Sequence, residues 1–270
     1  MSVKKDAKGR RSIAVEVEVP GTPERVWQAI ATGPGISAWF VPAEIDGKTM
    51  TLHFGPGMDT TATVTAWDPP HRFAAESHDL GPNAPPMATE WTVEARAGGT
   101  CVVRVVHSLF ASTDDWDGQL EGMEEGWPAF FAALRLYLAH HFGEPSACVQ
   151  VMSMAAGTPA EAWAALTRPL GLAGVQPGQR LGARAAGVPA LAGVVERVDQ
   201  SAHGHGAVLL LDAPAPGVAL VGAQHCGGTM ASVYLYLYGA GAASAAKREE
   251  AAWQAWIGRL FPQPAAPANP

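Results

Sequence analysis

The chain has 270 residues, of which 48% are hydrophobic and 16% are charged, and its formal net charge is −7. This length and hydrophobic content allow one large or two ordinary folded domains. They exclude global disorder, which requires low hydrophobicity and high net charge. An acidic chain repels the phosphate backbone, so no nucleic-acid partner is expected.

The charges are unevenly divided along the chain. Residues 1–146 contain 19 acidic and 11 basic residues, whereas residues 147–270 contain 6 and 7. Such asymmetry indicates two units with different surfaces. Five of the basic residues fall within residues 1–11, which we predict to be a flexible basic arm; contact with an anionic partner is the alternative.

The remaining composition indicates a cytoplasmic protein. Three cysteines, at positions 101, 148 and 226, are too few and too scattered for a disulfide framework. Two glutamates interrupt the apolar residues of the 13–19 segment, so this region is not expected to be a signal peptide. No stretch of the sequence is long and apolar enough to predict a membrane span.

The first half begins with a strand and a helix and continues as a run of strands. Residues 13–19 alternate between aliphatic and polar side chains, which is typical of a strand with one buried face. Thr22, Pro23 and Glu24 stand in a favoured order for a helix start. Turn residues then separate short segments that must pair antiparallel, because parallel strands need long crossovers; these segments are 41–46, 49–54, 60–67, 72–78, 88–95 and 100–108.

A long amphipathic helix follows these strands. Ser112 and Asp115 predict its N-terminal cap, and Gly143 marks its end. Its apolar residues fall on one face, at Met123, Trp127, Phe130, Phe131, Leu134 and Leu138. A curved antiparallel sheet with this helix across it is the simplest way to bury that face, so we predict an α+β fold.

The same order of motifs occurs twice, which indicates an internal duplication. The matches are residues 21–30 with 157–166, 98–100 with 227–229, and 124–127 with 249–253. The predicted organisation is therefore a basic arm over 1–11, a first domain over 12–143, a second domain over 147–261, and a disordered Pro/Ala-rich tail over 262–270.

Specific motifs of the first half are Thr22-Pro23-x-x-Val26-Trp27, Trp39-Phe40, Asp68-Pro69-Pro70-His71-Arg72-Phe73, Gly99-Thr100 and Glu125-Gly126-Trp127. Together they resemble the SRPBCC, or START-like, superfamily, and within it the branch of activator of heat-shock-protein-90 ATPase homologues. The second half keeps only Thr158-Pro159-x-x-Ala162-Trp163 and Gly228-Thr229, so it resembles a degenerate copy.

The resemblance implies two helix-grip domains, each a curved antiparallel sheet wrapped on a long C-terminal helix with two short helices. It also implies a cavity for an apolar small molecule, since members bind lipids, sterols or polyketides and some are cyclases or aromatases. The expected lining of the first cavity is Leu52, Phe54, Val64, Phe73, Trp91, Val103, Val105, His107, Met123, Trp127, Phe130, Phe131 and Leu134. The alternative is that these residues pack as a solid core.

His107 is the candidate catalytic residue, because a cyclase needs a general acid or base in apolar surroundings. It shares the strand register of Val103 and Val105, and His53, Glu76 and His78 are further candidates. The alternative for His107 is a solvated or backbone-bonded histidine near a strand end.

The second half offers weaker sites. Tyr234, Tyr236 and Tyr238 alternate on one face of a strand, where their hydroxyls either meet a ligand or lie at the rim of a packed face. The pairs His203-x-His205 and His225-Cys226 lack further groups at metal-ligand spacing, so no metal is expected. The Gly239-x-Gly241 sequence lacks the rest of a dinucleotide fingerprint, and no cofactor is expected.

These patterns favour a binding protein over an enzyme. The predicted function is binding of a hydrophobic, lipid-like or polyketide-like small molecule in the first domain. A polyketide cyclase or dehydratase that uses a cavity histidine is one alternative, and a module that regulates a chaperone ATPase is another. We expect either a monomer of two packed domains or a homodimer.

Overall fold

A computed structural model describes residues 3–55, 57–78, 84–111, 113–182, 187–201 and 203–263. The chain divides into two compact units, Met1–Gly143 and Glu144–Pro270. The predicted boundary between 143 and 147 falls at the same place. Of the predicted disordered tail, residues 264–270 lie outside the described part of the chain.

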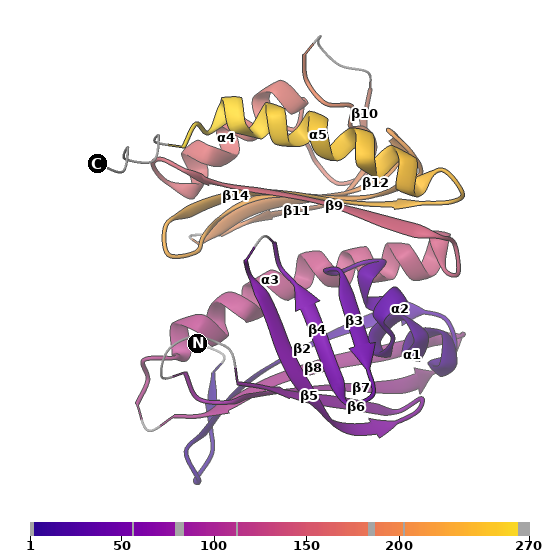
Figure 1. The fold of residues 1–270 in the computed structure, drawn as a ribbon, viewed down its shortest axis with the longest axis vertical. Coiled ribbons are helices and arrows are strands. Elements are labelled where there is room, and N and C mark those ends of the chain that lie inside the picture. Colours follow the sequence, from indigo (N-terminus) through magenta and orange to yellow (C-terminus); the bar gives the residue numbers. More distant parts are fainter. Residues whose placement is uncertain are drawn as a thin grey trace. The chain divides into compact units, whose positions relative to one another are not determined.

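In the described part of the first unit, eight antiparallel strands form one sheet in the order β1-β2-β8-β7-β6-β5-β4-β3. The sheet curves around the long helix α3, as Figure 1 shows. The strands are β1 (Lys4–Lys5), β2 (Arg10–Pro20), β3 (Ala43–Asp46), β4 (Thr49–His53), β5 (Asp59–Asp68), β6 (Arg72–Ser77), β7 (Met87–Arg96) and β8 (Thr100–Phe110). The predicted α+β class is thus confirmed.

The helices of this unit follow their local signals with one exception. The Thr22 hydroxyl caps the first helix by accepting a hydrogen bond from the Arg25 amide. The long helix starts at Asp117 rather than at the predicted cap; Ser112 lies outside the described residues, and Trp116 forms no side-chain cap bond within them. The helices are α1 (Pro23–Ala31), α2 (Gly33–Ser37), α3 (Asp117–Leu136) and a π-helical turn, η1 (Tyr137–His141).

The predicted flexible basic arm is instead a hairpin. Lys4 pairs with Ser12 and Lys5 with Arg11, so β1 extends the sheet beyond β2. One Asp6 carboxylate oxygen accepts hydrogen bonds from the amides of Lys8 (2.8 Å) and Arg10 (3.0 Å). The aspartate thereby satisfies two turn amides, which is how a short polar side chain fixes a turn. The five basic residues therefore have defined positions.

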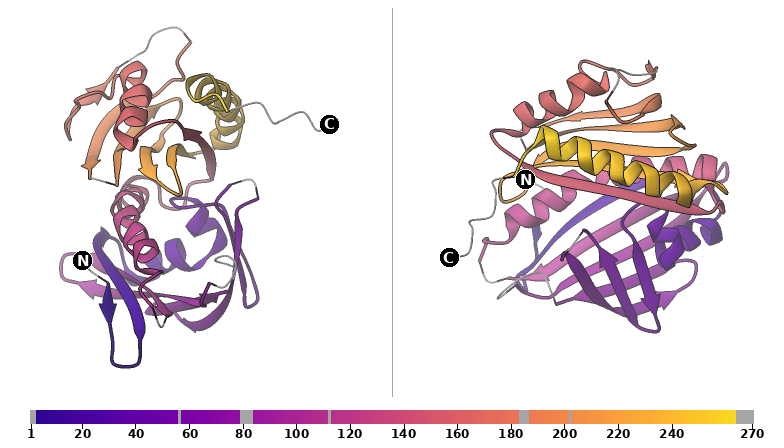
Figure 2. Two further views of the ribbon diagram at one scale, coloured as in Figure 1. Left: turned by 90° about the vertical axis from the view of Figure 1, so that its left-hand side faces the viewer. Right: turned by 45° about the horizontal axis from the view of Figure 1, so that its top comes forward.

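The second unit repeats this plan with a smaller sheet. Its six described strands are ordered β10-β11-β12-β13-β14-β9 and are all antiparallel. They are β9 (Ser146–Ala155), β10 (Arg180–Leu181), β11 (Ala192–Gln200), β12 (Gly204–Ala213), β13 (Gly217–His225) and β14 (Thr229–Tyr238). Helices α4 (Pro159–Leu170) and α5 (Ala242–Leu260) cover the same face of this sheet and share one apolar core with it (Figure 2).

The strand registers show that the two units are copies of one plan. Val19 pairs with Cys101 in the first sheet, and Ala155 pairs with Thr229 at the same place in the second. The Cys101 thiol lies 3.3 Å from the Gly21 carbonyl, and the Thr229 hydroxyl donates to the Gly157 carbonyl at 2.6 Å. Each glycine immediately precedes the Thr-Pro helix start, so the last strand and the first helix are joined in the same way in both units.

Gly35 allows α2 to touch the end of α1, and this contact positions the residues that follow α2. A Cβ atom at this residue would lie 1.9 Å from the Gln28 carbonyl oxygen and 2.9 Å from the Ala29 Cα. Both neighbours are backbone atoms, so neither can move without displacing a helix.

We therefore expect Gly35→Ala to lower the free energy of unfolding by about 2–3 kcal/mol, because overpacking forces the backbone to shift. The matched control is Gly122→Ala inside α3, where an added Cβ meets nothing within 4 Å. That variant is expected to be more stable by up to about 1 kcal/mol through helix propensity. Urea unfolding followed by tryptophan fluorescence measures both, and equal stability of the two variants would contradict the assigned contact.

Candidate functional site

A buried polar pair joins α3 to the centre of the first sheet. His107 on β8 lies between Ile13 of β2 and Thr89 of β7 in the sheet register, with its side chain on the face that α3 covers. The Trp127 indole N–H donates to His107 Nε2 at 2.8 Å, and His107 Nδ1 lies 2.9 Å from the Thr89 hydroxyl. Both imidazole nitrogens are therefore engaged, and only 6% of the residue is exposed.

The partners of His107 determine its protonation state. An indole N–H can only donate, so Nε2 must accept and carries no proton, which leaves the proton of the neutral ring on Nδ1. Burial lowers the pKa of His107 to about 4, because the charged imidazolium loses its hydration inside the protein. The imidazole is therefore neutral at pH 7.

The indole and imidazole form a flat platform. Their planes are 18° apart and their centroids 5.5 Å apart. Because an indole N–H points outward in the ring plane, the hydrogen bond places the imidazole beside the indole edge rather than above its face. The Phe40 ring packs on Trp127 at 5.3 Å with 23° between the planes.

Phe40 belongs to a group of phenylalanines at the open side of this platform. Its ring is edge-to-face with Phe130 at 4.7 Å and with Phe54 at 5.8 Å. All three side chains are partly exposed, whereas Trp127 beneath them is buried. These three residues therefore lie between the buried Trp127 ring and the surface.

The structure places the residues of the predicted cavity in two groups. The buried group is Val64, Phe73, Trp91, Val103, Val105, His107, Trp127, Phe131 and Leu134. The partly exposed group is Leu52, Phe54, Met123 and Phe130. Two surface pockets lie elsewhere, on the outer face of the first sheet and at the start of α5.

Sequence reasoning missed two members of the site. Phe40 stood in a recognised Trp-Phe motif but was not assigned to the lining, because it follows α2 in an irregular segment without periodicity. Thr89 became a partner of His107 only through the pairing of β7 with β8, which no local pattern specifies. The position of Thr89 on the alternating face of its strand was the one available signal.

The other predicted site residues do not join this group. His53 lies 2.9 Å from Asp59, and His78 lies 3.2 Å from Glu76, in solvent-accessible pairs. Burial raises the pKa of Tyr234 to about 12, and its hydroxyl lies 3.4 Å from the Met152 sulfur. Within the described residues, no group of three or more His, Cys, Asp or Glu side chains is placed to hold a metal ion.

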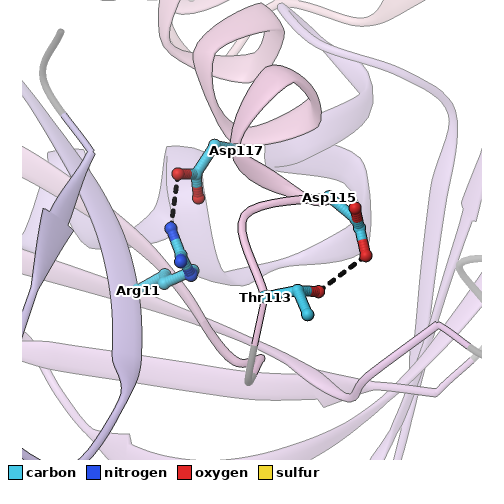
Figure 3. Close-up of polar contacts among 4 residues, drawn as sticks. All are labelled: Arg11, Thr113, Asp115 and Asp117. Carbon is cyan, nitrogen blue, oxygen red and sulfur yellow. Dashed lines mark hydrogen bonds and ion pairs between the residues drawn. The ribbon is translucent and has the colours of Figure 1, made fainter.

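A second polar pair joins β2 to the first residue of α3. Arg11 on β2 forms an ion pair with Asp117, the first residue of α3, and Thr113 donates to Asp115 at 2.6 Å (Figure 3). Arg11 is the inward-facing residue next to Ile13, the strand partner of His107. Together the two pairs attach α3 to the sheet at two separated points.

The described part of the second unit has no counterpart of the Trp127–His107 hydrogen bond; its ring pair Trp163–His205, with centroids 6.3 Å apart, involves the shorter helix α4 instead. Leu235 occupies the position that His107 has in the first unit, since it pairs with Val149 as His107 pairs with Ile13. Trp253 on α5 is fully buried, and its indole N–H has no hydrogen-bond partner among the described atoms. The core around it is apolar: Trp256 packs edge-to-face on Trp253 at 5.5 Å, and most of the other members are aliphatic side chains and alanines.

Residues 20–139 match the family model described as Activator of Hsp90 ATPase homolog 1-like protein. The matched stretch makes up most of the first unit, which is therefore similar to this family. The match ends before the second unit begins. A search of curated proteins found no match to the chain. None of the described helices is long and apolar enough to cross a membrane.

Three solved structures are reported for comparison. DynU16, from the dynemicin biosynthetic locus, is 19% identical, with 92% of this chain and 97% of that chain covered and a TM-score of 0.42. The di-domain ARO/CYC protein BexL, from the BE-7585A biosynthetic pathway, is 16% identical, with coverage of 96% and 100% and a TM-score of 0.43. The Aha1 dimer from Colwellia psychrerythraea is 20% identical, with coverage of 49% and 98% and a TM-score of 0.40.

The lowered pKa of His107 predicts how stability depends on pH. An unfolded histidine titrates near its reference pKa of 6.5, so between pH 6.5 and about 4 the unfolded chain binds a proton that the folded chain does not. The contribution of His107 to stability is therefore complete above pH 6.5 and is lost as the pH falls towards 4. The full loss is about 3 kcal/mol.

We expect His107→Gln to remove the part of the pH dependence of stability that His107 contributes, since a side-chain amide does not titrate in this range. The control is Thr89→Val, which keeps the imidazole and so keeps the pH dependence while losing one hydrogen-bond partner. Urea unfolding at several pH values between 4 and 7.5 measures the free energy of unfolding of each variant and of the native chain. If the free energy of unfolding depends on pH in the same way in the native chain and in His107→Gln, the assigned protonation state is contradicted.

Proposed function

We propose that the first unit binds a planar hydrophobic small molecule on the indole–imidazole platform, between α3 and the sheet. The observation that carries the proposal is the partly exposed ring of Phe40 on the buried Trp127. A planar ligand that takes the place of Phe40 exchanges one aromatic contact for another of the same geometry. Such offset ring contacts contribute about 0.5–1.5 kcal/mol beyond the area they bury.

Binding in this place requires Phe40 to move, and its surroundings favour that movement. Phe40 lies outside the regular helices and strands, between α2 and β3, and the residue is partly exposed. Trp39 beside it is held firmly, because its indole N–H donates to the Ala29 carbonyl at 2.9 Å and the residue is 1% exposed. The ligand therefore displaces Phe40 without unpacking Trp39.

In this proposal His107 is a positioning residue. Its Nε2 holds the Trp127 ring in place, and its Nδ1 is held by Thr89. A cyclase-type reaction would need the Nε2 lone pair as a base, and Trp127 already occupies that lone pair. These contacts support binding over catalysis by His107.

The proposal is tested with 2-naphthol as a planar apolar probe and the fluorescence of the tryptophans as the signal. We expect saturable quenching in the native chain, and about tenfold tighter binding by Phe40→Ala, because this variant no longer has to displace a ring. Trp127→Ala removes the platform and should abolish binding. Phe110→Ala is the matched control, since Phe110 is 64% exposed at the far end of β8.

Two results would contradict the proposal. One is the absence of saturable binding in both the native chain and Phe40→Ala. The other is binding that Trp127→Ala leaves intact. Circular dichroism of each variant establishes that the fold is kept, and Trp127→Phe provides a milder substitution if Trp127→Ala unfolds.

A further inference from the structure

The outer face of the first sheet, opposite to α3, contains a pocket lined mainly by charged residues. Its volume is about 350 Å³, and it opens on the surface of β1, β2, β7 and β8. The charged residues around it are Lys4, Lys5, Asp6, Arg10, Glu90 and Arg104. The folding of the β1 hairpin onto the sheet therefore places several N-terminal bases around one hollow.

The strand registers explain why most of these basic side chains lie on one face of the sheet. Lys4 pairs with Ser12, and Arg10 lies two residues before Ser12 on the same face of β2. Arg104 reaches the same face from β8, since it pairs with Glu16. Side chains at such alternating positions point to one face of a sheet.

The acids of this pocket are already engaged by other groups. Arg72 lies 2.6 Å from the Glu90 carboxylate, and Asp6 accepts the two backbone bonds that hold the hairpin turn. Outside the lining, Glu16 lies 3.2 Å from Arg104. Asp6 also has a pKa below its usual value, chiefly because of those backbone hydrogen bonds, so it stays ionised.

The bases nearest the hairpin have no such acidic partner. Arg10 donates to the Ser108 hydroxyl at 2.9 Å, and in the described part of the chain no carboxylate forms an ion pair with Lys4, Lys5 or Arg10. Lys5 pairs with the inward-facing Arg11, so the bases whose side chains share the face of the pocket are Lys4, Arg10 and Arg104, a surplus of one over the acids Asp6 and Glu90. Residues 1–146 have a surplus of acids, so this concentration of bases runs against the charge of the unit.

We propose that this pocket binds the phosphoryl group of an anionic ligand. A phosphate monoester carries about −1.5 to −2 charges at pH 7 and three acceptor oxygens, which complement the positive surplus and the donors of the pocket. Arginine presents a planar fork of donors to phosphate oxygens, and lysine adds a point charge. The Ser12 hydroxyl lies in the lining as a further donor. The pocket lies on the opposite face of the sheet from the platform, so this proposal is independent of the first.

The test uses the ¹⁵N-labelled full-length chain and inorganic phosphate, with chloride replaced so that the ionic strength stays constant. We expect saturable shifts of the amides around residues 4–6, 10–12 and 104–106. Lys4→Gln and Arg10→Gln should each weaken binding about tenfold, the effect of losing one charge-assisted hydrogen bond. The matched control is Lys8→Gln, which removes an exposed charge from the same hairpin but outside the pocket and should change binding less than twofold.

A second arm uses vesicles of phosphatidylcholine with and without phosphatidic acid, to distinguish a lipid headgroup from a free phosphate. Binding to phosphatidic acid vesicles that depends on Lys4 and Arg10, without binding of free phosphate, would support the proposed phosphoryl site and identify its ligand as a lipid headgroup. The proposal is overturned if neither probe binds in a way that depends on Lys4 and Arg10. It is also overturned if Lys8→Gln weakens binding as much as Lys4→Gln, because diffuse surface charge would then explain the effect.

Discussion

The hydrogen bond from the Trp127 indole to His107 is the interaction on which the rest of the first unit depends. It joins the middle of α3 to the middle strands of the sheet, and it works only while the imidazole is neutral. Burial maintains that neutral state by lowering the pKa of His107 to about 4. The same bond fixes the plane of the indole, so the face that Phe40 covers is already oriented for a second ring.

The two units share one arrangement of strands and helices, and they differ at the Trp127–His107 pair. Both units join the last strand to the first helix through the glycine before a Thr-Pro cap. Only the first, within the described residues, places an acceptor opposite its helix tryptophan; in the second, Leu235 takes that place and the buried Trp253 N–H has no partner. The second unit therefore keeps the architecture around a mainly apolar core, and within its described residues that core has no counterpart of the platform.

Much of the architecture was predictable because it is local. The alternation along residues 13–19 and the apolar stripe on α3 follow from strand and helix periodicity. The features that were missed depend on contacts between distant segments. Lys4 and Lys5 form a strand only because β2 is there to pair with them, and Thr89 meets His107 only through strand register. The start of α3 was placed too early, since local cap signals gave no information on the Arg11–Asp117 pair at its first turn.

The ¹⁵N NMR spectrum of the His107 imidazole in the full-length chain, recorded from pH 7 downwards, tests the Trp127–His107 hydrogen bond most directly, because it shows which ring nitrogen carries the proton. At pH 7 we expect Nε2 to have the shift of an unprotonated acceptor and Nδ1 to carry the proton. We also expect this pattern to persist until the pH approaches the lowered pKa of about 4. A proton on Nε2 at pH 7, or titration of His107 near the ordinary value of 6.5, would contradict this hydrogen bond and the neutral state that it requires.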